Sequence, residues 1–345
     1  MKLTAIEIKE ISEFDKLFSF NIQFKNRTFL VTGAGGMTGS GIVKWLLYLN
    51  EKYDANIKVI SSTRHPEILP EYVESGDNIS FCGFGEETDY LGKTHVDYII
   101  HGAAPTGREF FINNPVETIR IIVDETEKLL ELAKKNPGCR FLYMSSMDIY
   151  GPINVKEPVQ ENYVGGIDAD NIRNGYPLGK KCAEFLCHAY HSEYGVDTVV
   201  VRPASIQGLF QKYSEPRIFN EILRCIIENR NLVMKSDGMS KKCFIYTLDV
   251  ISAVFTILLK GETNEVYNIS NPDTFITIRD LAERIFERFC PDINIEFDIA
   301  GGKNAGYLPT FGFVQDITKL ENLGWKPCRN IYDIYSVDIE RFEKR

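Results

Sequence analysis

The feature that most constrains the fold is a glycine-rich turn placed between an apolar run and an apolar helix. Residues 28–31 form the run, Gly33-x-x-Gly36-x-x-Gly39 forms the turn, and residues 42–49 have the composition of a buried helix. Glycines at this spacing allow a sharp turn and let the backbone approach a pyrophosphate, while the helix N-terminus offers free N–H groups. Because isolated glycine repeats are mostly ordinary turns, the prediction of a dinucleotide site depends on the flanking strands.

The second strand of such a unit is present. Residues 58–63 read as a strand that begins about thirty residues after the first, as a strand–helix–strand crossover requires. An acidic residue at the end of this strand would accept hydrogen bonds from the adenosine ribose, but Thr63 occupies that position and Arg64 follows it. We therefore expect the site to tolerate a 2′-phosphate. The alternative is that Arg64 is an exposed loop residue.

The composition is that of a large folded enzyme. The 345 residues exceed the usual size of one domain, and 44% of them are hydrophobic. A net charge of -9 argues against nucleic acid or an anionic membrane as the main partner. The eight cysteines lack metal-ligand spacing, and no apolar stretch has the length of a signal peptide or a membrane span. We expect a soluble, cytoplasmic protein that binds no metal.

The chain divides into three parts. Residues 1–27 carry apolar residues at spacings of three and four (Ile8, Ile11, Phe14, Leu17 and Phe18), which predicts a helical N-terminal extension. Residues 28–203 alternate short apolar strands with helices, which predicts an α/β fold with a Rossmann-type doubly wound parallel sheet. Residues 204–345 mainly form a smaller C-terminal α/β substrate lobe, with part of 244–270 returning to the Rossmann domain. The strand candidates are residues 28–31, 58–62, 79–82, 98–101, 140–144 and 198–201.

Reactive side chains follow the predicted strands at the edge where ligands bind in such sheets. Tyr176 and Lys180 are four residues apart at the start of the predicted helix 176–194, so they project from one face. An ammonium near a phenol favours the phenolate and lowers its pKa, which would let Tyr176 act as a base. Ser146, after the fifth strand, could hydrogen-bond the same substrate oxygen. Taken alone, a Tyr-x-x-x-Lys pair is usually just a solvated helix face, so its position after these strands matters.

With these motifs the chain resembles the extended short-chain dehydrogenases/reductases that modify nucleotide sugars, namely the epimerase, dehydratase and decarboxylase group. The resemblance covers about residues 28–330. The matching residues are Thr32-Gly33-x-x-Gly36-x-x-Gly39, His101-x-Ala-Ala104, Asn114-Pro115, Ser145-Ser146-x-Asp148-x-Tyr150-Gly151, Tyr176-x-x-x-Lys180 with Ala183-Glu184, Tyr194-Gly195, Arg202-Pro203, Tyr267-Asn268 and Leu323-Gly324-Trp325-x-Pro327.

The resemblance implies a mechanism that uses a tightly held NAD, with NADP as the alternative. Tyr176 would take the proton from a sugar hydroxyl, usually at C4, as hydride passes to the nicotinamide. Lys180 would hold the nicotinamide ribose, and Ser146 would bind the reacting oxygen. The resemblance places the coenzyme on Gly33, Gly36, Met37, Gly39, Arg64, Ala103, Ala104, Tyr176, Lys180 and Pro203, and the substrate on Ser146, Ser205 and Lys242.

The step after oxidation differs among members of this group. Dehydratases and decarboxylases carry a carboxylate at the position of Asp148, so a lyase is preferred to an epimerase. Some dehydratases have a second acid at the position of Met147, and this chain lacks it. The alternative interpretation is that Asp148 only caps a turn or binds a sugar hydroxyl.

Several positions depart from the family pattern. Phe84 stands where an adenine-binding aspartate is frequent, Ile122 replaces a common helix asparagine, and Lys242 replaces an arginine used on the nucleotide diphosphate. Ser205 likewise replaces a frequent asparagine. Arg217 and Arg224 could supply the missing charge, or they are surface residues.

Two further functions remain open on the sequence alone. Arg64 would suit an NADPH-dependent 4-keto-sugar nucleotide reductase, and the same fold could serve a non-catalytic dinucleotide-binding regulator. The helices 116–135 and 176–194 carry apolar faces, which in the family pack into a homodimer, although ordinary core packing explains them too. His188 and His191 lack the further ligands that a metal site needs.

Overall fold

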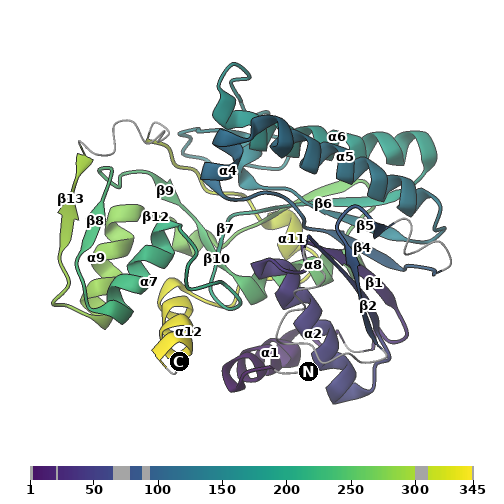
Figure 1. Cartoon of the computed structure of the whole chain (residues 1–345), viewed down its shortest axis with the longest axis horizontal. Coiled ribbons are helices and arrows are strands. Elements are labelled where there is room, and N and C mark those ends of the chain that lie inside the picture. The colour runs from purple at the N-terminus through teal and green to yellow at the C-terminus, as the bar shows by residue number, and fades with distance from the viewer. Residues whose placement is uncertain (1–2, 21, 65–77, 88–93, 300–309, 344–345) are drawn as a thin grey trace.

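The computed structural model describes residues 3–20, 22–64, 78–87, 94–299 and 310–343 (Figure 1). Its centre is a parallel seven-stranded sheet with the order β11-β6-β5-β4-β1-β2-β3. The predicted Rossmann-type fold is confirmed, and the strand order reverses between β1 and β4, where such sheets bind their ligands. The strands are β1 (Thr28–Thr32), β2 (Lys58–Thr63), β3 (Ile79–Gly83), β4 (Tyr98–His101), β5 (Arg140–Met144), β6 (Asp197–Pro203) and β11 (Glu265–Ile269).

Helices cover both faces of this sheet (Figure 1). On one face lie α5 (Pro115–Lys134) and α6 (Gly175–Tyr194), and on the other lie α2 (Met37–Tyr53) and α8 (Thr247–Lys260). Successive strand side chains point to opposite faces, so Phe29 and Val31 of β1 enter one hydrophobic core while Leu30 enters the other. The strand therefore carries apolar residues on both faces instead of on one face alone.

The smaller lobe is built from short strand pairs and helices. The pairs are β7 (Ser205–Gln207) with β10 (Phe244–Tyr246), β9 (Lys241–Lys242) with β12 (Ile276–Thr277), and β8 (Leu232–Met234) with β13 (Ile295–Phe297). The helices of this part are α7 (Ile218–Glu228), α9 (Ile278–Phe289) and α12 (Ile331–Glu343), whereas α11 (Thr318–Glu321) packs against β11 of the central sheet.

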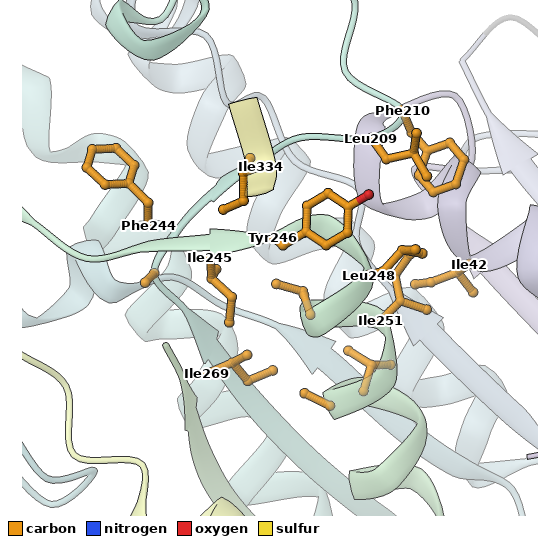
Figure 2. Packing of buried hydrophobic residues seen from close by; sticks show 14 of the residues in the cluster. Ile42, Leu209, Phe210, Phe244, Ile245, Tyr246, Leu248, Ile251, Ile269 and Ile334 are labelled. Carbon is orange, nitrogen blue, oxygen red and sulfur yellow. The ribbon is translucent and has the colours of Figure 1, made fainter. Parts of the chain in front are cut away.

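One hydrophobic core joins this lobe to the sheet. Figure 2 shows Ile42 of α2, Ile251 of α8 and Ile334 of α12 gathered around Tyr246 of β10. Between β10 and β11 the chain forms α8, which packs against α2, and β11 pairs with β6 of the central sheet. The exact division into domains stays a prediction.

The predicted N-terminal helix is α1 (Ala5–Phe18), which begins with a capping box between Thr4 and Glu7. Its buried face is narrower than the apolar spacing predicts, because Ile11 and Phe14 are buried whereas Ile8 and Leu17 are exposed. In their place three acidic residues of this helix, Glu7, Glu10 and Asp15, are buried. None of the helices in the described ranges has the length and apolar composition needed to cross a membrane.

Candidate active site

A cavity of about 2530 Å³ lies at the carboxyl ends of the sheet strands and extends along the smaller lobe. It is lined by every residue that the sequence places in the site. These are Gly33, Gly36, Met37, Gly39, Arg64, Ala103, Ala104, Ser146, Asp148, Tyr176, Lys180, Pro203, Ser205 and Lys242. The structure thus brings together positions that are up to about two hundred residues apart in the chain, as the parallel topology requires.

The glycine turn has the geometry of a dinucleotide cradle. Gly33 adopts a φ of +71°, and a Cβ there would lie 3.0 Å from the backbone of Gly102 and Ala103. A Cβ at Gly39 would collide with the carbonyl oxygen of Gly33. Gly36 is the N-cap of α2, and no side chain caps this end of the helix, which leaves its N–H groups directed at the cavity. These residues fit the pyrophosphate of NAD.

The carboxyl ends of β2 and β3 form the part of the cavity where an adenosine would lie. Thr63, Arg64 and Phe84 line it, and Arg64 is exposed. Behind them the buried carboxylate of Glu87 accepts hydrogen bonds from the hydroxyl of Ser62 and the backbone N–H of Gly85. Burial raises the pKa of Glu87.

A buried histidine supports the small residues after β4. The ring of His101 lies between the hydroxyls of Thr32, 2.7 Å from Nδ1, and Thr126, 3.1 Å from Nε2. Since Thr126 donates its own proton to the carbonyl of Ile122, Nε2 is the donor and Nδ1 accepts from Thr32. Burial lowers the pKa of His101 to about 3, which keeps the ring neutral. The Thr32 hydroxyl also accepts the N–H of Ala103 at 3.3 Å, which fixes the turn under the cavity.

Tyr176 and Lys180 lie on the first turns of α6, and both are buried. The ring of Tyr176 stacks on Phe111 at 5.6 Å. The ammonium of Lys180 donates to the carbonyl of Met144 at 2.6 Å and lies 5.9 Å from the centre of the Tyr176 ring. The pair therefore faces the cavity from one helix, next to the end of β5.

The protonation behaviour of this pair differs from the expectation. Burial and the charge of Asp148 raise the pKa of Tyr176, against the weaker opposite effect of its hydrogen bond with Ser146. Burial also lowers the pKa of Lys180 to about 7. The expected lowering of the phenol pKa by Lys180 is wrong for this arrangement, because desolvation dominates and the ammonium is engaged with Met144.

Ser146 and Asp148 belong to one turn after β5. Ser146 is the N-cap of the 3₁₀ helix η1 (Met147–Tyr150), and its hydroxyl accepts the N–H of Asp148 at 3.1 Å. The residue that caps this turn is thus Ser146, which leaves the exposed carboxylate of Asp148 directed at the cavity. Met147, at the position of the second acid in some dehydratases, is buried.

Cationic side chains lie at the substrate end of the cavity. Burial lowers the pKa of Lys242; Asp148 acts in the opposite direction, and Arg173 and Arg217 add to the lowering. Arg217 also pairs with Glu215 at 3.0 Å. These charges therefore lie close enough to influence one another beside the Ser146 turn.

Two arginines lie differently from what the sequence predicts. Arg173 was missed, although it lies only three residues before Tyr176, which is the one signal that could have found it. Arg224, offered as a source of charge, instead donates to Glu221 and to the carbonyls of Tyr213 and Glu215 and does not line the cavity.

The two histidines of α6 have structural partners. Nδ1 of His188 lies 2.7 Å from the side-chain oxygen of Asn264, and Nδ1 of His191 lies 2.9 Å from the carbonyl of Val196. Within the described ranges, no group of three or more His, Cys, Asp or Glu residues could hold a metal ion.

Known proteins with similar sequences and folds agree with this geometry. Residues 29–270 match the model of the NAD dependent epimerase/dehydratase family. UDP-glucuronic acid decarboxylase 6 of Arabidopsis thaliana is 29% identical over 79% of this chain and 77% of its own length. UDP-glucuronic acid decarboxylase 2 of the same plant is 30% identical over 93% of this chain and 69% of its own length.

Solved structures share the fold. The dTDP-glucose 4,6-dehydratase of Bacillus anthracis, solved with NAD, is 20% identical with a TM-score of 0.75 and covers 92% of this chain and 97% of its own. The UDP-glucose 4-epimerase of Thermotoga maritima is 22% identical with the same TM-score and covers 92% and 99%. The resemblance inferred from the sequence, the NAD coenzyme and an enzyme of the lyase or isomerase kind are thereby confirmed. The chain belongs to the NAD dependent epimerase/dehydratase family.

Proposed function

We propose that the protein is a lyase that decarboxylates a nucleotide-linked uronic acid after transient oxidation of the sugar at C4. The observation that carries this proposal is the group of cationic side chains, Lys242, Arg173 and Arg217, around the Ser146–Asp148 turn. The diphosphate of any nucleotide sugar gains from such surroundings, and a uronic acid brings a second anionic group to them. The relatives named UDP-glucuronic acid decarboxylases act on a substrate of this class.

The residues around C4 control its proton. The Tyr176 phenolate oxygen accepts the proton of the C4 hydroxyl, and the Ser146 hydroxyl holds the same oxygen. Burial raises the pKa of Tyr176, and the Lys180 ammonium donates to the carbonyl of Met144, so the phenolate forms only when Lys180, on the same helix face, turns toward it. NAD, when bound, takes up and returns the two electrons of the oxidation at C4.

Oxidation at C4 prepares the loss of carbon dioxide. A ketone at C4 makes the C6 carboxylate a β-keto acid, so the C5–C6 bond can break with its electron pair delocalised onto the C4 oxygen. The hydrogen-bond donors Tyr176 and Ser146 stabilise that developing charge. A proton from water then adds to C5, and we assign the positioning of that water to the carboxylate of Asp148, which shares the turn of Ser146. Negative charge on Asp148 also limits how strongly the cations stabilise the substrate carboxylate before the bond breaks.

The test is incubation with UDP-, dTDP-, GDP- and CDP-linked sugars, each as the neutral hexose and as the uronic acid, without added reduced coenzyme. Mass spectrometry should show loss of carbon dioxide from a uronic acid. Loss of water, or an unchanged mass with an inverted centre, would instead mean dehydration or epimerisation. Turnover that strictly requires NADPH would favour the reductase alternative, which the position of Arg64 in the cavity supports.

Tyr176→Phe separates catalysis from binding. We expect this variant to lose about 10²–10⁴-fold in turnover, the usual contribution of a positioned acid or base. NAD binding, measured by calorimetry, should change little, because the ring and its stacking on Phe111 remain. Full activity in Tyr176→Phe would contradict the mechanism, and absence of turnover in the unmodified protein with every sugar would leave the regulator alternative.

We also propose a homodimer through the outer face of α5 and α6. Val116, Ile119 and Phe185 are exposed on these helices, and 67% of the Phe185 surface is accessible. A second copy of the same face would bury them in a symmetric four-helix contact. Light scattering should give the dimer mass, and Phe185→Asp should give the monomer; a monomeric unmodified protein would refute this.

Eight cysteines without a disulfide support a cytoplasmic location.

A further inference from the structure

Helix α1 lies outside the matched family segment, which begins at Phe29, yet it forms part of the cavity wall. Its first two turns contribute to the lining at residues Thr4, Ala5, Ile6, Glu7 and Lys9. The same cavity contains the glycine turn and the start of α2. A helix outside the matched segment is therefore in a position to affect what the cavity holds.

The cavity end of α1 is attached to the coenzyme-binding helix. Glu7 pairs with Lys44 of α2 at 2.6 Å, and both residues are more than nine-tenths buried. Lys44 lies four residues after Ser40 and seven after Met37, so the three share one face of α2, and all three line the cavity. The Lys44 ammonium also lies 5.0 Å from the ring of Phe210. The first turn of α1 is thus held beside the helix that begins at the pyrophosphate cradle.

The middle of α1 is attached to the smaller lobe. Arg329, between α11 and α12, donates to Glu10 at 3.0 Å and to Glu13 at 2.5 Å. The hydroxyl of Tyr246 donates to the same carboxylate of Glu10 at 3.0 Å, and Figure 2 shows Tyr246 in the core that joins the two parts. Helix α1 therefore links α2 to the smaller lobe through buried or half-buried charges.

We propose that α1 is part of the coenzyme site and slows the release of NAD by closing the cavity beside α2. Opening this side requires the first turn of α1 to leave Lys44, or the helix to leave Arg329 and Tyr246. Retention suits an enzyme whose coenzyme ends each cycle as it began, since release between the two half-reactions would strand an oxidised sugar. The inference rests on NAD as the coenzyme and not on the identity of the sugar.

The test compares NAD dissociation in full-length variants, measured by stopped-flow displacement without any sugar. Glu7→Gln combined with Lys44→Met removes both charges of the pair at the cavity, so neither partner is left without the other. Arg329→Met removes the ion pairs of the other attachment and leaves the hydrogen bond from Tyr246 to Glu10 in place, and Arg329 does not line the cavity. We expect NAD to dissociate at least ten times faster from both variants. Lys16→Met, which changes an exposed residue of the same helix, is the matched control and should equal the unmodified protein.

Circular dichroism and melting temperatures of the NAD-free variants show whether each one is folded. If folded Arg329→Met releases NAD within twofold of the unmodified rate, α1 does not retain the coenzyme through its link to the smaller lobe, and the proposal fails. An unchanged rate in the Glu7/Lys44 double variant refutes it equally, and either variant suffices if the other does not fold. Because no sugar is present, a failed decarboxylation assay would not affect these outcomes.

Discussion

A buried ion pair under the Ser146 turn allows a quantitative prediction about how the site is supported. Arg202 of β6 donates to Glu184 of α6 at 3.0 Å through Nε and at 2.6 Å through Nη2. Its third nitrogen donates to the hydroxyl of Tyr150 at 2.9 Å and to the carbonyl of Glu161 at 2.7 Å. Tyr150 ends the same 3₁₀ turn that presents Ser146, so the pair holds that turn against the sheet.

Glu184→Gln should destabilise the fold strongly. Glutamine keeps one acceptor oxygen, so one of the two charge-assisted hydrogen bonds is lost, worth about 1.5–3 kcal/mol. The guanidinium also stays buried without its counter-charge, and removing one partner of a buried pair typically costs about 3–5 kcal/mol in total. We take about 3 kcal/mol as the expected loss, because Tyr150 and Glu161 still accept from Arg202. The melting temperature should then fall by roughly 5 °C or more.

Urea unfolding followed by fluorescence, together with calorimetry, measures this loss. Glu283→Gln is the matched control, since Glu283 pairs with Arg279 at 3.0 Å on the exposed side of α9 and should change stability by less than about 0.5 kcal/mol. Replacing both buried partners, Glu184→Met with Arg202→Met, should recover part of the loss, because no unpaired charge remains.

The reasoning fails if Glu184→Gln loses less than about 1 kcal/mol, the range of an exposed pair. It fails equally if the double variant is less stable than the single one, since the cost would then come from packing and not from an unpaired charge. Activity gives a second check, because loosening Tyr150 should lower turnover more than NAD binding.

Two more predictions concern positions away from this pair. Gly39→Ala should prevent NAD binding in calorimetry and lower the melting temperature, because its Cβ would collide with the carbonyl of Gly33; normal binding would show that the turn can widen. Burial raises the pKa of Asp338 to about 7, so the stability present below pH 4 is lost as the pH rises through 7. Asp338→Asn should therefore raise the free energy of unfolding at pH 8 by at most about 4 kcal/mol, and the melting temperature with it. At pH 4 neither quantity should rise, and a gain independent of pH would contradict this.

The strands of the central sheet could be predicted because their signal is local. Each is a short apolar run bounded by polar or glycine residues, and β5 has the predicted bounds while β6 extends from Asp197 to Pro203, slightly beyond them. Parallel strands that are buried on both faces lack the alternation of apolar and polar residues, so a short apolar run is the signal that predicts them. Short strands joined by helical crossovers imply a parallel sheet covered on both faces, which is why the fold class could be predicted without coordinates, whereas the strand order was not predicted.

The grouping of the site residues was likewise accessible, because the carboxyl ends of parallel strands meet at one edge. The protonation of Tyr176 was not, since it depends on how deeply the ring is buried and on Lys180 turning to the carbonyl of Met144. Arg173 was not predicted because it comes near Lys242 only in the folded chain, in which two segments about seventy residues apart in the sequence lie close together. Such distances are not encoded in spacing along the chain.

Helix α1 shows where the usual interpretation of charge along a helix fails. Acidic residues between apolar ones normally mark the solvated face, and on that rule Glu7 and Asp15 should be exposed. Both are buried because cations from another helix, Lys44 and Lys52 of α2, reach them. A carboxylate is buried in a folded protein only where a partner balances its charge, so these acids lie on the face of α1 that packs against α2 and not on its solvated face. The exposure of Ile8 and Leu17 follows from the same rotation, because a helix that buries its acids turns some apolar residues outward.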